Sequence, residues 1–211
     1  MISAITHAST VEQSLKLLEN HPDFVDVSTI KHVQLDIRYA TENNFLKRNL
    51  YGQHTRCFLN KYAALMLARA AEGIARTAPG MQLLVFDCLR PQSVQKQLWA
   101  AVVGTAREKY VADPAHGSIH SYGLAVDLSL VDSSGKELDM GTGFDDFSQL
   151  SEPAWEEKFL KLGRLKAEHL QNRKLLRTTM VEAGFLPLAA EWWHFDAMPK
   201  EQVRKSFRII E

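Results

Sequence analysis

The sequence predicts an α+β fold: a compact single domain in which a small central antiparallel sheet is flanked by helices. The length of 211 residues suits one domain with a sizeable core. An apolar share of 45% and a charged share of 24% are typical of a globular protein. Strand-like and helix-like segments are mixed without a regular βαβ alternation, which favours α+β over a doubly wound sheet. We expect one domain over residues 1–211, with residues 1–32 as an N-terminal helical extension.

Apolar periodicity and end signals predict the helices. The longest spans Asn60 to Arg76, because Asn60 can cap its start and Pro79-Gly80 stops it. A short helix is expected over Val11 to Glu19. The same signals predict three further helices, over Ser93 to Val103, Ala154 to Gly163 and Leu165 to Ala183.

Four segments are typical of strands. Val33 to Ile37 alternates in polarity, and Met81 to Phe86 is a continuous apolar run. Leu124 to Val131 is strand-like, and a final strand is expected over Glu191 to Phe195.

Charge and cysteine content narrow the classes of function. Lys plus Arg and Asp plus Glu number 25 each, so the composition predicts no nucleic-acid partner and no membrane partner, and leaves a small neutral or zwitterionic ligand open. Cys57 and Cys88 are expected to be buried thiols, and they lack the close spacing of a thiolate zinc site. No leader is visible at Met1 to His7, so we expect the cytoplasm, or the periplasm if a leader was removed.

His120 and Asp127 bracket a glycine in the first chemically informative segment. Seven extended residues span roughly 23–25 Å, whereas two ligand atoms must lie about 2.0–2.2 Å from one ion. The chain must therefore bend sharply between them. Gly123 can adopt backbone angles closed to other residues, so a turn there would bring Asp127, on the following strand, to face His120.

A second segment places Glu191 and His194 in a run of aromatic residues. A carboxylate in such apolar surroundings stays ionised only if a nearby cation balances its charge or if its role is to transfer a proton. Residues three apart face opposite ways in a regular strand, so the chain must bulge or turn if both serve one site. His116 is an alternative ligand, four residues before His120, but Pro114 makes a continuous helix there unfavourable.

His120, Asp127 and His194 together leave a fourth zinc position for water, which is typical of a catalytic site. Glu191 could take a proton from that water and pass it to the leaving amine. Arg90 lies between a predicted strand and a helix, where its charge could stabilise an oxyanion. Each residue alone has an ordinary explanation, and Arg90 could simply pair with Asp87. Their combination is what predicts a hydrolytic centre.

These residues carry a family resemblance. Ser118-x-His120-x-x-Gly123-x-Ala125-x-Asp127, followed by Glu191-Trp192-Trp193-His194, resembles the D-alanyl-D-alanine dipeptidases of the VanX type. Further matching segments lie in the family's order between about residues 36 and 195: Arg38-Tyr39-Ala40-Thr41, Asn44-Phe45, Arg90-Pro91, Met140-Gly141 and Phe144-Asp145.

The resemblance implies one Zn2+ per chain and a compact α+β fold, as in the wider group that includes D,D-carboxypeptidases and hedgehog domains. By position, His120, Asp127 and His194 would bind the metal, while Glu191 would be the general base and Arg90 the stabiliser of the tetrahedral intermediate. The implied substrate-binding residues are Ser118 and Asp145, at the dipeptide's amino group, and Tyr39, which would line the pocket. Asp146 beside Asp145 is an alternative for the amine.

The implied reaction is hydrolysis of D-Ala-D-Ala to two D-Ala. A carboxylate aimed at the substrate ammonium would reject longer chains. Two alternatives are a peptidoglycan D,D-carboxypeptidase or endopeptidase, whose substrate has no free amine near the cut, and a non-catalytic zinc-containing binding module. The sequence leaves open whether the chain forms a homo-oligomer.

Overall fold

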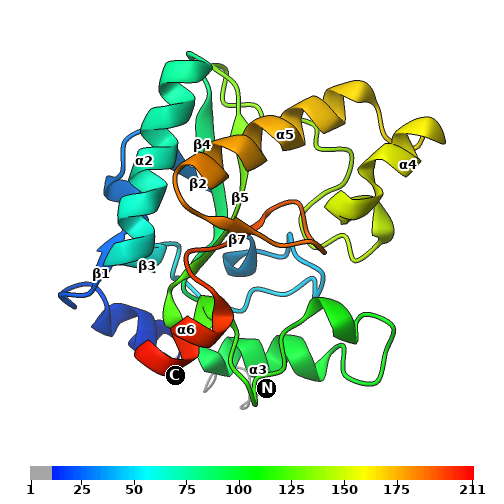
Figure 1. Ribbon diagram of the computed structural model, residues 1–211. Helices are drawn as coiled ribbons and strands as arrows, with labels where there is room; N and C mark the ends of the chain where they lie inside the picture. Colours follow the sequence, from blue (N-terminus) through cyan, green and yellow to red (C-terminus); the bar gives the residue numbers. More distant parts are fainter. Residues whose placement is uncertain (1–10) are drawn as a thin grey trace.

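The structure is a computed structural model that describes residues 11–211 (Figure 1). The first ten residues of the expected N-terminal extension lie outside this part. Residues 11–17 are helical, in agreement with the helix expected from Val11, and Val11, Leu15 and Leu18 are buried in the core.

A five-stranded sheet forms the centre of the molecule, in the order β2-β4-β5-β7-β6. Its strands are β2 (Val33–Leu35), β4 (Gln82–Asp87), β5 (Ala125–Val131), β7 (His194–Asp196) and β6 (Leu186–Pro187). The α+β class is confirmed, but the sheet is mixed, because β2 runs parallel to β4 while the other pairs are antiparallel. Parallel neighbours need a crossover connection, and α2 (Lys61–Thr77) lies in the segment that joins these two strands.

A two-stranded antiparallel ribbon, β1 (Phe24–Asp26) and β3 (Phe58–Asn60), leads into α2. The Asn60 side chain accepts a hydrogen bond from the backbone N–H of Tyr62, which is the helix cap expected from the sequence. Helices α2 and α5 (Ala167–Glu182) pack on each other and against the sheet, as Figure 1 shows.

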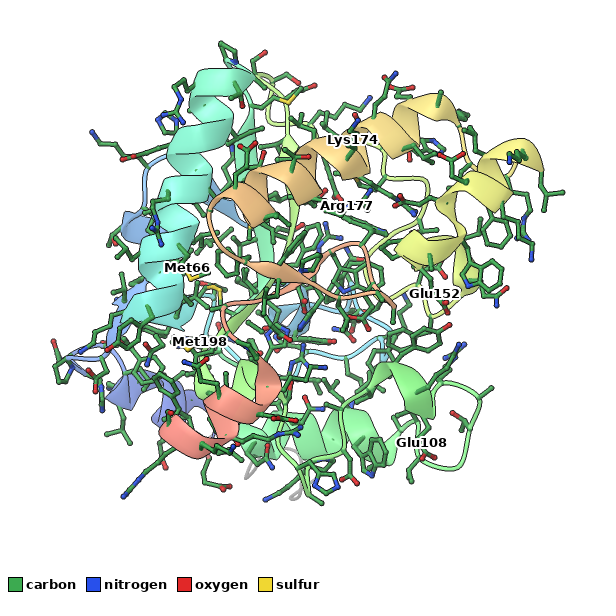
Figure 2. All side chains as sticks on the ribbon, in the orientation of Figure 1. Met66, Glu108, Glu152, Lys174, Arg177 and Met198 are labelled. Atoms are coloured by element: carbon green, nitrogen blue, oxygen red, sulfur yellow. A yellow bond between two sulfur atoms is a disulfide. The ribbon has the colours of Figure 1, made fainter. Side chains whose placement is uncertain are left out.

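The remaining helices surround the ends of the sheet. They are α3 (Gln92–Ala100), α4 (Glu156–Lys161) and α6 (Lys200–Ser206), with 3-10 turns at Val27–Thr29, Arg38–Ala40, Glu108–Tyr110, Ile119–Tyr122, Gln149–Ser151 and Pro153–Trp155. Arg177 of α5, labelled in Figure 2, pairs with Glu156 at 3.1 Å and joins α5 to α4. Within residues 11–211, no helix combines the length and apolarity needed to cross a membrane.

Two expectations about local structure are wrong. The last strand does not begin at Glu191: residues 192–193 form a bend, and β7 starts at His194. Cys57 and Cys88 are buried as expected, but they are paired in a disulfide rather than free, with their Cα atoms 5.7 Å apart. The pairing follows from the backbone hydrogen bond between Leu89 and Phe58, which brings the segment after β4 beside β3.

Candidate metal centre and active site

Strand register brings the expected ligands together. Asp127 on β5 lies opposite His194 on β7 and opposite Asp87 on β4, so three neighbouring strands present acidic and imidazole groups in one row. His120 reaches this row from the 3-10 turn Ile119–Tyr122. Gly123 ends that turn with a positive φ of 67°, which is the bend expected between His120 and Asp127.

The hydrogen bonds of both imidazoles leave a free nitrogen pointing into the row. His120 Nδ1 lies 2.6 Å from the carbonyl oxygen of Cys88, so this nitrogen donates and Nε2 keeps its lone pair. His194 Nε2 lies 2.8 Å from Asp196 Oδ1, so this nitrogen donates and Nδ1 is the nitrogen that faces the row. His120 Nε2 and His194 Nδ1 face each other at 3.1 Å, a distance at which two ring nitrogens need a proton or a metal ion between them.

The geometry of this cluster fits a metal ion. Asp127 Oδ1 lies 2.9 Å from His194 Nδ1, and Asp127 Oδ2 lies 3.3 Å from His120 Nε2. A tetrahedral zinc site with bonds of about 2.0–2.1 Å has ligand atoms about 3.3 Å apart. All three residues are buried, and together they form a group that could hold a metal ion. The expected ligand set is therefore assembled in space.

The pKa values of His194 and Asp127 show that this cluster favours a bound positive charge. Burial lowers the pKa of His194, but the carboxylates of Asp196 and Asp127 outweigh it and raise that pKa to about 10. Burial disfavours ionised Asp127, yet the two imidazoles hold its pKa far below the usual range. A raised pKa means that His194 must give up a proton when it binds a metal ion.

Glu191 lies just before the bend that leads into β7, which resolves the conflict of facing directions expected for a regular strand. Its side chain is buried and lines the same cavity as the three ligands. Burial raises the pKa of Glu191 to about 8, with Asp127 and Asp145 adding to the effect and His194 and Arg90 opposing it. A carboxyl group tuned toward neutral pH is suited to take and return a proton.

Arg90 is fixed by a set of buried acceptors. Its Nε donates to Asp87 Oδ2 at 2.8 Å and its Nη1 donates to Gln95 Oε1 at 2.9 Å. Asp87 is held in turn by the Tyr51 hydroxyl at 2.7 Å. The pairing with Asp87 thus exists, but it also directs Nη2 to within 3.4 Å of Asp127 Oδ2, at the edge of the candidate metal centre.

Asp145, not Asp146, lines the cavity. The Tyr39 hydroxyl donates to Asp145 Oδ1 at 3.2 Å, and the backbone N–H of Phe45 donates to Oδ2 at 3.1 Å. Burial raises the pKa of Asp145 to about 7, against the effects of Phe45 and Arg90. Asp145 also has a positive φ of 61°, a backbone strain that its fixed side chain sustains.

Arg173 of α5 positions the loop that carries Asp145. Its fully buried guanidinium donates to the carbonyl oxygens of Met140 at 2.7 Å and Leu150 at 2.9 Å. Thr142 in the same loop accepts from the indole N–H of Trp192 at 2.8 Å. Because Trp192 follows Glu191, this network joins the Asp145 loop to the segment that carries Glu191.

The cavity that these residues line has a volume of about 190 Å³. Sites for drug-sized ligands usually measure roughly 300–1,000 Å³, so this cavity suits a small molecule. Ser118 and Tyr39 line it as expected, while His116 belongs neither to its lining nor to the metal-binding group. Sequence reasoning missed Asp196 and Gln95, which hold His194 and Arg90. Asp196 had a usable signal, because residues two apart on a strand face the same way.

A buried set of two imidazoles and one carboxylate, with a second carboxylate and an arginine around a small cavity, is the arrangement of a metal-dependent hydrolase. Comparison with known proteins supports the same class, a metal-dependent hydrolase. A family profile described as D-ala-D-ala dipeptidase, of the M15 peptidases, matches residues 20–210.

Similar proteins bear the same name. The D-alanyl-D-alanine dipeptidase of Escherichia coli (strain K12) is 36% identical over 175 residues, covering 82% of this chain and 84% of the relative. Those of Enterococcus faecalis (strain V583) and Streptomyces coelicolor are each 30% identical, over 194 and 189 residues, covering 84% and 82% of this chain and 92% and 89% of the relatives. The chain belongs to the M15 peptidase family of D-Ala-D-Ala dipeptidases, which are metal-dependent hydrolases.

Proposed function

We propose that the protein is a zinc-dependent dipeptidase that hydrolyses D-Ala-D-Ala to two molecules of D-Ala. The observation that carries the proposal is the pair of imidazole nitrogens, His120 Nε2 and His194 Nδ1, which face each other at 3.1 Å beside Asp127. Zinc is the preferred metal because it favours two nitrogens and one carboxylate in tetrahedral geometry with one open position. When bound there, it would polarise a water molecule and lower its pKa.

The surrounding side chains have separate tasks in this proposal. Glu191 takes the proton from the attacking water and delivers it to the leaving amine. Arg90, held rigidly by Asp87 and Gln95, places positive charge where the oxyanion develops, at no cost of reorganisation during the reaction.

Recognition of the substrate amine is assigned to Asp145, with Ser118 and Tyr39 beside it in the cavity wall. Tyr39 and Phe45 already occupy one hydrogen-bonding site on each carboxylate oxygen, which fixes the direction of the remaining lone pairs. A free ammonium group would balance the buried carboxylate, whereas an acylated amine would leave it unpaired.

The direct test is a substrate panel. We expect the zinc-loaded protein to release D-Ala from D-Ala-D-Ala but not to cleave L-Ala-L-Ala or N-acetyl-D-Ala-D-Ala. Equal cleavage of the acetylated compound would contradict the dipeptidase and favour a D,D-carboxypeptidase. No cleavage of any compound by protein with full zinc content would favour the non-catalytic binding module.

The pH dependence of kcat/KM tests the two buried carboxyl groups. Glu191 must be ionised to accept a proton and Asp145 must be ionised to bind the ammonium group, so activity rises with pH as both deprotonate. Their pKa values are raised by burial to about 8 and about 7, and bound zinc lowers both. We therefore expect an acid limb below these two values, with a logarithmic slope approaching two. Asp145→Asn should reduce the slope to one, and an unchanged slope would refute this assignment.

We further propose that residues 1–211 act as one domain, with residues 1–32 as its extension. The cytoplasm remains the predicted location, and the periplasm the alternative. Disulfides persist in oxidising compartments, so the Cys57–Cys88 pair gives a way to tell the two apart. Thiol labelling of freshly extracted protein should find both cysteines free if it comes from the cytoplasm, and neither if it comes from the periplasm.

A further inference from the structure

The charges around the cavity point to a second recognition site, for the other end of the substrate. This inference rests on the proposed function: a dipeptide with a free amino group also carries a free carboxylate. Among residues 11–211, the lysine and arginine side chains that line the cavity are Arg90, Lys109, Lys200 and Arg204. Besides the proposed metal ion, these four groups supply the positive charge that can balance a substrate carboxylate in the cavity.

Two of these four cations already form salt bridges with carboxylates of the protein. Arg90 is bonded to Asp87 and Gln95 and directed toward Asp127. Lys109 Nζ lies 3.2 Å from Glu152 Oε1, and Glu152, labelled in Figure 2, also accepts from the Tyr110 hydroxyl at 2.7 Å. These cations already have carboxylate partners.

The other two lie on α6 and have weaker partners: Lys200 lies near enough to Asp196 for their charges to interact, and Arg204 bonds to a backbone carbonyl. Lys200 and Arg204 are four residues apart, so they share one face of the helix, and buried Val203 packs α6 onto the core. Arg204 Nη2 donates to the carbonyl oxygen of Gly117 at 3.4 Å, which places the guanidinium next to Ser118. In the part of the chain that the structure describes, neither cation lies within salt-bridge distance of a carboxylate.

The position of α6 suits a substrate that spans the metal centre. Asp145 lies on the loop after β5, which is held by α5, whereas α6 follows β7 and packs on the turn that carries His120 (Figure 1). Asp145 and the two cations of α6 thus line the cavity from different elements, with His120, Asp127 and His194 also lining it. One cavity therefore offers a carboxylate for an ammonium group, cations for a carboxylate, and the metal-binding group.

We propose that Lys200 and Arg204 bind the C-terminal carboxylate of the dipeptide. Asp145 binds the amino group and the Lys200–Arg204 pair binds the carboxylate, so the site accepts a dipeptide whose two ends are both free. The two side chains are positioning residues, because they touch the substrate away from the reacting atoms. Both are solvent-exposed, so we expect each alone to contribute modestly and the pair to contribute about 10-fold in kcat/KM.

The test compares the zinc-loaded full-length chain with Lys200→Met/Arg204→Met on two substrates, D-Ala-D-Ala and D-Ala-D-alaninamide, which lacks the carboxylate. We expect the double variant to lose about 10-fold or more in kcat/KM on the dipeptide, mainly through KM, and to keep the wild-type value on the amide. The matched control is Lys205→Met/Arg208→Met, which removes the same net charge from exposed side chains that do not line the cavity. It should match wild type on both substrates.

The possible outcomes distinguish failure of this inference from failure of the proposed function. Equal losses on dipeptide and amide, or equal losses in the test and control variants, would overturn this inference while leaving the proposed function intact. Failure of the wild-type protein to cleave D-Ala-D-Ala would contradict the proposed function itself, and this inference with it. Unchanged melting temperatures in both double variants would show that packing of α6 is preserved.

Discussion

Glu191→Gln retains the metal and loses turnover by about 10²- to 10⁴-fold, which is the usual contribution of a general acid or base. The amide keeps the size of the side chain in its buried position but cannot take a proton from water. Glu191 is not a member of the group that could hold a metal ion, so the ligand set stays complete. The measurements are kcat with D-Ala-D-Ala and zinc content by atomic absorption.

Glu157→Gln, an exposed position on α4, is the control and should behave as wild type. Stoichiometric loss of zinc from Glu191→Gln would contradict the assignment, because it would make Glu191 a ligand. Full turnover with full zinc content would show that another group moves the proton.

His120→Ala abolishes tight metal binding. The variant leaves His194 and Asp127 as the remaining ligands and creates a second open position at the ion. Removing a residue that merely holds a ligand typically weakens metal affinity by about 10- to 100-fold, and removing the ligand itself should cost more. Competition of the purified protein with a chromophoric zinc chelator measures the change.

His116→Ala is the matched control for this experiment, because His116 is the alternative ligand four residues earlier and lies outside the metal-binding group. It should keep wild-type zinc affinity. The reverse result, with His116→Ala losing zinc and His120→Ala retaining it, would overturn the ligand assignment.

Much of the site could be predicted from the sequence because its chemistry is encoded locally. His120 and Asp127 share a short segment whose only sharp bend is at Gly123, and the positive φ there confirms the reason for choosing that position. The link from this segment to Glu191 and His194, almost 70 residues later, rests on the chemistry of the combined ligand set and on the family resemblance. No local pattern reports that β5 and β7 are neighbours.

Other features depend on pairing between distant strands and were missed for that reason. The parallel placement of β2 beside β4 and the closeness of Cys57 to Cys88 follow from strand order, which apolar periodicity does not encode. Gln95 reaches Arg90 only because α3 folds back after Pro91. Strand ends were also misplaced: the aromatic residues before His194 suggested a longer strand, but their side chains pack within a bend.

The central claim is that hydrolysis depends on a metal held by His120, Asp127 and His194. The most direct measurement is D-Ala release by one preparation of the protein before chelation, after removal of metal, and after addition of one equivalent of zinc. The account predicts that activity disappears with the metal and returns in proportion to zinc bound, up to one ion per chain. Full turnover by the metal-free protein would contradict it.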